Sequence, residues 1–143
     1  MFNQTVFKIL KPANEVFEAF VAPEKIKNFW FTSSARWEQG QTVGLRYEEY
    51  NADVSIEVLE IEPNKKIIFR WGTDGEGNRV TISLKELDQA STIIEITEEG
   101  FKEDDDELIR NLIDNKEGWV YMLTCLKGYL EFDVNQLKGA IVK

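Results

Sequence analysis

Residues 58–71 read VLEIEPNKKIIFRW, and this stretch decides the predicted fold. Its second half alternates, because Ile67, Phe69 and Trp71 share one face of an extended chain. Its centre, Glu-Pro-Asn-Lys at 62–65, contains residues that favour a turn. Two extended runs joined by a short turn are typical of an antiparallel hairpin. The stretch therefore predicts part of a sheet with one apolar face.

The same alternation continues on both sides of this hairpin. It covers residues 43–47 and 54–61 before the turn, and residues 80–85 and 92–99 after it. Its phase slips at Val58-Leu59, where apolar residues change parity, and this slip predicts a β-bulge. Several strands separated by short turns predict an antiparallel meander.

Helical patterns flank this strand region. A short strand, Phe2–Ile9, precedes two short helices, the first beginning at Pro12 and the second spanning Glu24–Asn28. A long helix follows the last strand, with Asp104–Asp106 expected as its N-caps and Gly118 allowing either a kink or two separate helices. The apolar stripe of this long helix consists of Leu108, Leu112, Trp119, Met122, Leu123, Leu126, Leu130 and Val134.

This order of elements predicts an α+β fold. A one-sided sheet needs a cover, and a long amphipathic helix needs a surface on which to lie. The prediction is therefore a curved antiparallel sheet wrapped around the long C-terminal helix, with two short helices after the first strand. The length of 143 residues suits one domain, spanning 1–143.

Composition excludes several classes of function. The formal net charge of −9 opposes binding to nucleic acid. The chain contains no histidine, which excludes a Ser-His-Asp triad and a His-ligated metal site. Its one cysteine, Cys125, fits a reducing cytoplasm, and no apolar run is long enough for membrane insertion. We therefore expect a cytoplasmic protein with no metal, no cofactor and no nucleic-acid partner.

Four segments, taken in order, carry a family resemblance. Residues 11–20 read KPANEVFEAF and are followed by APEKI at 22–26; the second segment is the hairpin 58–71. The third is EEGF at 98–101, and the fourth is the helix that begins around Gly118-Trp119. In this order they resemble the START-like (SRPBCC) superfamily, in particular the branch similar to the activator of the heat-shock protein 90 ATPase (AHSA-like).

The resemblance implies a helix-grip fold with a cavity between the sheet and the long helix. Relatives in this superfamily bind lipids, sterols, polyketides or plant aromatics, and some catalyse cyclisation. The function that we expect is a domain that binds a small hydrophobic ligand. One alternative is a cochaperone-like or other regulatory role with a protein partner, which includes a homodimer. A second alternative is a cyclase or hydratase that uses the same cavity, although the residues show no catalytic set.

The candidate ligand-binding residues are apolar and aromatic side chains on the expected inner faces, together with one carboxylate. Such residues suit a pocket for an apolar ligand, and they equally suit plain core packing. The candidates are Trp30, Tyr47, Ile56, Phe69, Trp71, Ile82, Ile96, Glu98, Trp119, Leu123 and Leu126.

Glu98 has two interpretations. Parity places it on the face of Ile94 and Ile96, where a carboxylate at the mouth of a cavity could anchor a ligand or act as a base. Alternatively it is a solvated residue at the end of a strand, and the usual exposure of strand ends favours this interpretation. The resemblance implies that histidine is often found at this position, so this chain departs from the pattern.

Overall fold

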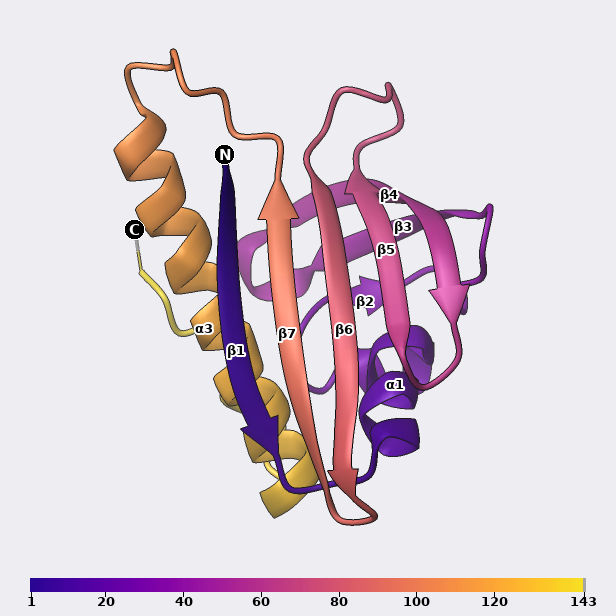
Figure 1. Cartoon of the computed structure of the whole chain (residues 1–143). Helices are drawn as coiled ribbons and strands as arrows, with labels where there is room; N and C mark the ends of the chain where they lie inside the picture. The colour runs from indigo at the N-terminus through magenta and orange to yellow at the C-terminus, as the bar shows by residue number, and fades with distance from the viewer. Residues whose placement is uncertain (143) are drawn as a thin grey trace.

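The computed structural model describes residues 1–142, and its centre is a seven-stranded antiparallel sheet in the order β1-β7-β6-β5-β4-β3-β2. Figure 1 shows the long strands β1, β7 and β6 side by side, with α3 along one edge. The strands are β1 (Phe2–Ile9), β2 (Thr32–Ser33), β3 (Thr42–Tyr47), β4 (Ala52–Glu62), β5 (Lys66–Trp71), β6 (Arg79–Asp88) and β7 (Ser91–Glu99). The helices are α1 (Ala13–Val21), α2 (Pro23–Ile26), the 3-10 turn η1 (Glu48–Tyr50) and α3 (Leu108–Phe132).

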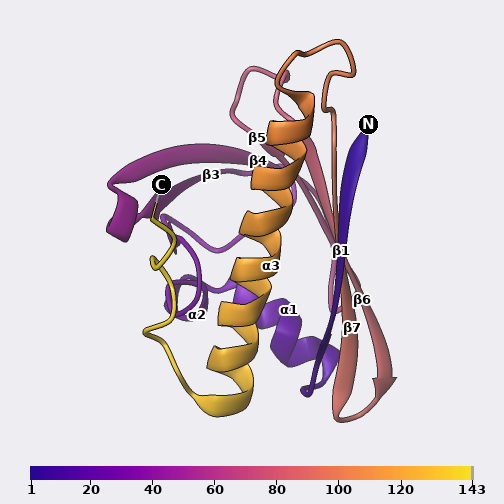
Figure 2. The ribbon, with the colours of Figure 1, turned by 90° about the vertical axis from the view of Figure 1, so that its left-hand side faces the viewer.

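The predicted α+β fold is confirmed: the sheet curves around α3, and the two short helices follow β1. Figure 2 shows α3 along the concave side of the sheet, with β3 and β4 curling over towards it. The predicted bulge is also confirmed, because the register between β4 and β5 shifts between Val58 and Glu60. A bulge increases the local bend of a strand, so it helps β4 to curve.

The hydrophobic core lies between the concave face of the sheet and the helices. The inward residues of β5, Ile67 and Phe69, are fully buried, whereas Ile68 and Arg70 lie on the outer face and are partly exposed. Helix α3 packs against β1, and α1 packs against β6 and β7. The alternation seen in the sequence is therefore the alternation between core and outer face.

Some predicted boundaries were wrong. The second short helix is Pro23–Ile26 rather than Glu24–Asn28, and β2 was not predicted because two residues carry no periodicity. The long helix is continuous through Gly118, so the prediction of two separate helices does not hold. It ends at Phe132, because Asp133 adopts a left-handed conformation, which leaves Val134 outside the helix.

The predicted N-caps Asp104–Asp106 precede the true start of α3 at Leu108. Asp105 instead organises the turn before the helix, where its side chain accepts a hydrogen bond from the Glu107 amide at 2.8 Å. None of the helices in the described residues is both long and apolar enough to cross a membrane. The predicted domain end at residue 143 lies outside the described residues.

The hairpin between β5 and β6 requires glycine at position 77. A Cβ atom there would lie 1.8 Å from the carbonyl oxygen of Trp71, so the backbone would have to move. We expect Gly77→Ala to lower the free energy of unfolding by about 2 kcal/mol, measured by urea denaturation. Glu76→Ala, at the exposed neighbouring position, is the control and should stay within about 0.5 kcal/mol of the wild type. Equal stability of the two variants would contradict the steric argument.

Candidate functional site

A pocket of about 540 Å³ lies between the inner face of the sheet, the first half of α3 and Ile141, which follows α3. Its walls are mainly aromatic, and its carboxylate and amide groups come from β7 and α3. Its lining residues are Trp30, Phe31, Tyr47, Tyr50, Trp71, Glu98, Asp114, Asn115, Glu117, Gly118, Trp119, Tyr121, Met122 and Ile141.

Three tryptophans from three different segments form one wall of the pocket. Trp30 follows α2, Trp71 ends β5 and Trp119 lies in α3. Ring centroids are 6.3 Å apart for Trp30 and Trp71, 5.4 Å for Trp30 and Trp119, and 6.3 Å for Trp71 and Trp119. Trp30 meets Trp71 edge to face, an arrangement that the ring quadrupoles favour. The rings therefore support one another and form a stable aromatic surface.

Glu98 is the polar centre of the site. Its Oε1 accepts hydrogen bonds from Trp71 Nε1 at 3.3 Å, Trp119 Nε1 at 3.1 Å and Asn115 Nδ2 at 2.9 Å. Its Oε2 accepts one from Asn78 Nδ2 at 3.0 Å. The residue is only 5% exposed although it lies near the end of β7, so the expectation of a solvated strand end was wrong. The reason is that α3 covers this end of the strand and supplies two of the donors.

The two asparagines are themselves held in place. Asn3 on β1 donates to Asn115 Oδ1 at 3.1 Å and to the Leu112 carbonyl at 2.7 Å, which turns the Asn115 amino group towards Glu98. Asn78 packs against Gly100, where an added Cβ would lie 2.5 Å from Asn78 Oδ1. The donors around Glu98 are thus preorganised by neighbouring strands and by a glycine.

The chain after α3 contributes Ile141 to the pocket lining. Figure 2 shows this segment turning back from the lower end of α3 towards the β3–β4 end. Three tyrosine hydroxyls fasten its backbone. Tyr47 accepts from the Gly139 amide at 3.1 Å, Tyr121 accepts from the Ala140 amide at 3.0 Å, and Tyr50 both accepts from and donates to Ile141. We call residues 133–142 the C-terminal strap.

Burial raises the pKa of Tyr47 and of Tyr121, which moves their ionisation further above physiological pH. Their neutral hydroxyls can both donate and accept hydrogen bonds. Burial likewise raises the pKa of the nearby Cys125 thiol, which therefore stays protonated and unreactive. The site thus contains no activated nucleophile among these three groups.

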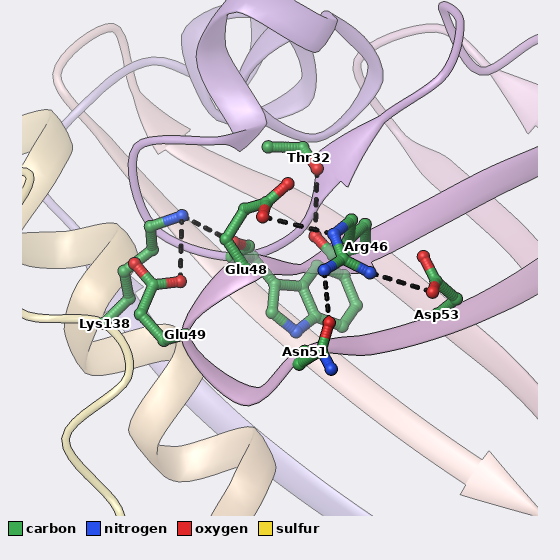
Figure 3. Close-up of polar contacts among 8 residues, drawn as sticks. Thr32, Arg46, Glu48, Glu49, Asn51, Asp53 and Lys138 are labelled. Atoms are coloured by element: carbon green, nitrogen blue, oxygen red, sulfur yellow. Dashed lines mark hydrogen bonds and ion pairs between the residues drawn. The ribbon is translucent and has the colours of Figure 1, made fainter.

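The β3–β4 corner under the strap is rigidified by charge. Figure 3 shows Arg46 surrounded by Glu48, Asn51 and Asp53. Its guanidinium pairs with Asp53 at 2.9 Å and with Glu48 at 3.1 Å, and its carbonyl accepts from Thr32 Oγ1 at 3.0 Å. This corner carries Tyr47 and Tyr50, so it positions the groups that bind the strap.

Lys138 joins the strap to this corner and to the aromatic wall. Its ammonium lies 3.6 Å from Glu49 (Figure 3). It also donates to the Trp30 carbonyl at 3.2 Å and lies 5.8 Å from the centre of the Tyr47 ring.

The comparison with protein families decides the identity of the fold. The family described as Activator of Hsp90 ATPase homolog 1-like protein matches residues 11–131. The chain belongs to this family. We refer to it below as the AHSA1 family. Among curated proteins, none is similar enough to count as a match.

Solved structures agree with this assignment. The crystal structure of the protein SSP2350 from Staphylococcus saprophyticus is 46% identical, with a TM-score of 0.82, and the match covers 94% of this chain and 95% of that one. The solution structure of the Aha1 dimer from Colwellia psychrerythraea is 18% identical, with a TM-score of 0.79 and coverages of 92% and 97%.

DynU16, a putative protein in the dynemicin biosynthetic locus, is 22% identical, with a TM-score of 0.80, and the match covers 94% of this chain and 48% of that one. At this identity, DynU16 and the Colwellia protein support the fold alone.

The candidate residues predicted from sequence fall into two groups in this AHSA1-family domain. Five line the pocket, namely Trp30, Tyr47, Trp71, Glu98 and Trp119. Six are fully buried in the core beyond the pocket lining, namely Ile56, Phe69, Ile82, Ile96, Leu123 and Leu126.

Sequence reasoning missed the asparagine donors and the strap. Asn115 lies one helical turn before Trp119, and this spacing on one face of α3 was the available signal. The strap carries no periodic pattern, so no sequence signal placed Ile141 beside Tyr50. The structure adds Phe31, Tyr50, Asn78, Asn115, Tyr121 and Ile141 to the residues that build the site.

The hydrogen bonds to Glu98 contribute to stability. Trp119→Phe keeps most of the ring but removes one donor to a buried carboxylate. We expect it to lower the free energy of unfolding by about 1–2 kcal/mol more than Trp30→Phe does, measured by chemical denaturation. Trp30 is the matched control, because its indole packs in the same cluster without a described bond to Glu98. If both variants lost the same free energy of unfolding, the smaller ring volume alone would explain the effect.

The tyrosine bonds hold the strap closed. Tyr50→Phe removes both hydrogen bonds to Ile141. We expect the Ile141 amide to exchange its hydrogen about five- to tenfold faster, measured by NMR, because about 1 kcal/mol of local stability is lost. Tyr129→Phe is the control, since that ring stacks on Phe29 and its hydroxyl has no described hydrogen bond to the strap. Unchanged exchange in Tyr50→Phe would mean that other contacts hold the strap.

Proposed function

We propose that this AHSA1-family domain binds a small, largely apolar ligand in the aromatic pocket between the sheet and α3. The observation that carries the proposal is the pocket itself, whose volume of about 540 Å³ lies within the usual range for small-molecule sites. Its tryptophans support one another without filling it. Aromatic walls with a few fixed polar groups are the common design of such sites.

Gly118 gives this proposal a specific structural basis. It lies in the middle of α3, where glycine costs about 1 kcal/mol relative to alanine. It lines the pocket, and an added Cβ would meet nothing within 4 Å. Gly118 is exposed at the mouth of the pocket, so the absence of a side chain there keeps the entrance beside Trp119 open, at a cost to helix stability.

Binding is a better proposal than catalysis for Glu98. Glu98 is held by four hydrogen bonds from the protein, three on Oε1 and one on Oε2, so its carboxylate is a fixed group with one oxygen still able to accept from a ligand. We therefore assign it to anchoring and orientation. A cyclase or hydratase would be indicated instead by turnover that Glu98→Gln abolishes while ligand binding persists.

The role with a protein partner stays a prediction. The description of the family names an activator of the Hsp90 ATPase, and an assay of that ATPase with and without this domain would test a cochaperone role. A homodimer and the cytoplasmic location likewise stay predictions.

The proposal is tested with a ligand panel and one pocket variant. Native mass spectrometry of gently purified protein, followed by thermal shift against lipids, fatty acids and planar aromatics, should reveal a bound mass or a saturable rise in Tm. In Gly118→Leu the added side chain stands at the mouth of the pocket and narrows it, so we expect Tm to hold or rise while ligand affinity falls at least tenfold.

Val120→Leu, on α3 outside the pocket lining, is the matched control and should leave affinity unchanged. The absence of a bound mass and of any shift across the whole panel would contradict the proposal.

A further inference from the structure

The negative charge of Glu98 is stabilised but not neutralised by its surroundings. All four described donors are neutral N–H groups, two from indoles and two from amides. Such donors satisfy a carboxylate's oxygens and leave its charge in place. The Glu98 oxygens therefore present a negative charge at the wall of the aromatic pocket, and because the residue is only 5% exposed, this charge acts more strongly than it would in water.

The remaining charged groups of the lining have the same sign. Asp114 and Glu117 stand on α3 on either side of Asn115, at the exposed rim of the pocket. Among residues 1–142, neither lysine nor arginine lines the pocket. The described lining therefore supplies no cation to compensate the charge of Glu98.

The aromatic wall favours a cation as well. The face of an indole ring is electron-rich, and tryptophan is the best cation–π partner. Trp71 and Trp119 both donate their N–H to the same carboxylate oxygen, which polarises the rings towards greater negative charge. Lys138 lies 5.8 Å from the centre of the Tyr47 ring, and Glu49 at 3.6 Å compensates its positive charge.

We propose that the ligand of this pocket is a hydrophobic molecule that carries a positively charged nitrogen, with the cation placed against Glu98 and the tryptophan faces and the apolar body along the other aromatic rings. This inference rests on the proposed function and specifies its ligand class. An anionic ligand, such as a fatty-acid carboxylate, would meet charge of its own sign. A metal ion needs several ligating side chains together, and the described residues contain no such group.

Three probes of one shape test the charge preference: phenylpropylamine, phenylpropanol and phenylpropanoate. Their dissociation constants are measured by NMR titration of the wild-type protein, in which the indole N–H signals of Trp71 and Trp119 report directly on the environment of Glu98. We expect the amine to bind about tenfold more tightly than the alcohol. We expect the carboxylate to bind more weakly than the alcohol.

Two variants assign the preference to Glu98. Glu98→Gln keeps a carbonyl oxygen for the donors from Trp71, Trp119 and Asn115, and should reduce the amine preference to less than about threefold. Glu15→Gln makes the same change in net charge at an exposed position on α1 and should leave the preference intact. Retention of the preference in Glu98→Gln would overturn the role of Glu98.

The ratio of the dissociation constants of the alcohol and the amine, measured with the wild-type protein, decides the proposal even if a variant fails to fold. An alcohol that binds as tightly as the amine overturns the cationic ligand while the proposed binding function stands. The cationic ligand is also overturned if none of the three probes binds but a neutral or anionic member of the wider panel does. If nothing in either set binds, both the proposed function and this inference are overturned.

Discussion

The hydrogen bonds that converge on the carboxylate of Glu98 are the constraint on which the rest of the site depends. They join the end of β5, the hairpin before β6, the end of β7 and the first half of α3 through one side chain. A buried carboxylate is tolerated only when its oxygens are satisfied, so each of these segments has to be in place at the same time. The position of α3 across the sheet and the orientation of two tryptophans are therefore linked.

The sheet could be predicted because its physical cause is local. Alternation along a strand directly reflects a core face and an outer face, and the change of parity at Val58-Leu59 directly reflects the bulge. The predicted helix boundaries were less accurate than the predicted strands. The acidic run before α3 offers several residues of nearly equal capping ability, so the sequence does not select one start. Only the turn formed by Asp105 selects Leu108 as the start.

The site was predictable in its apolar part and not in its polar part. Parity placed Tyr47, Trp71 and Glu98 on the inner face, because that depends on the strand alone. The burial of Glu98 depends on Asn78 and Asn115, which come from a loop and a helix that only the tertiary fold brings together. The strap could not be predicted from the sequence either, because hydrogen bonds between tyrosine hydroxyls and a backbone leave no periodic pattern.

The attachment of the strap has a kinetic consequence. Its backbone is fastened to the pocket by tyrosine hydroxyls, whereas the other walls belong to the core. Segments held in this way detach locally at a much lower free energy than global unfolding. Detachment of the strap would remove Ile141 and its neighbours from this side of the pocket, so the exchange of a bound molecule by this route would depend on how often the strap detaches.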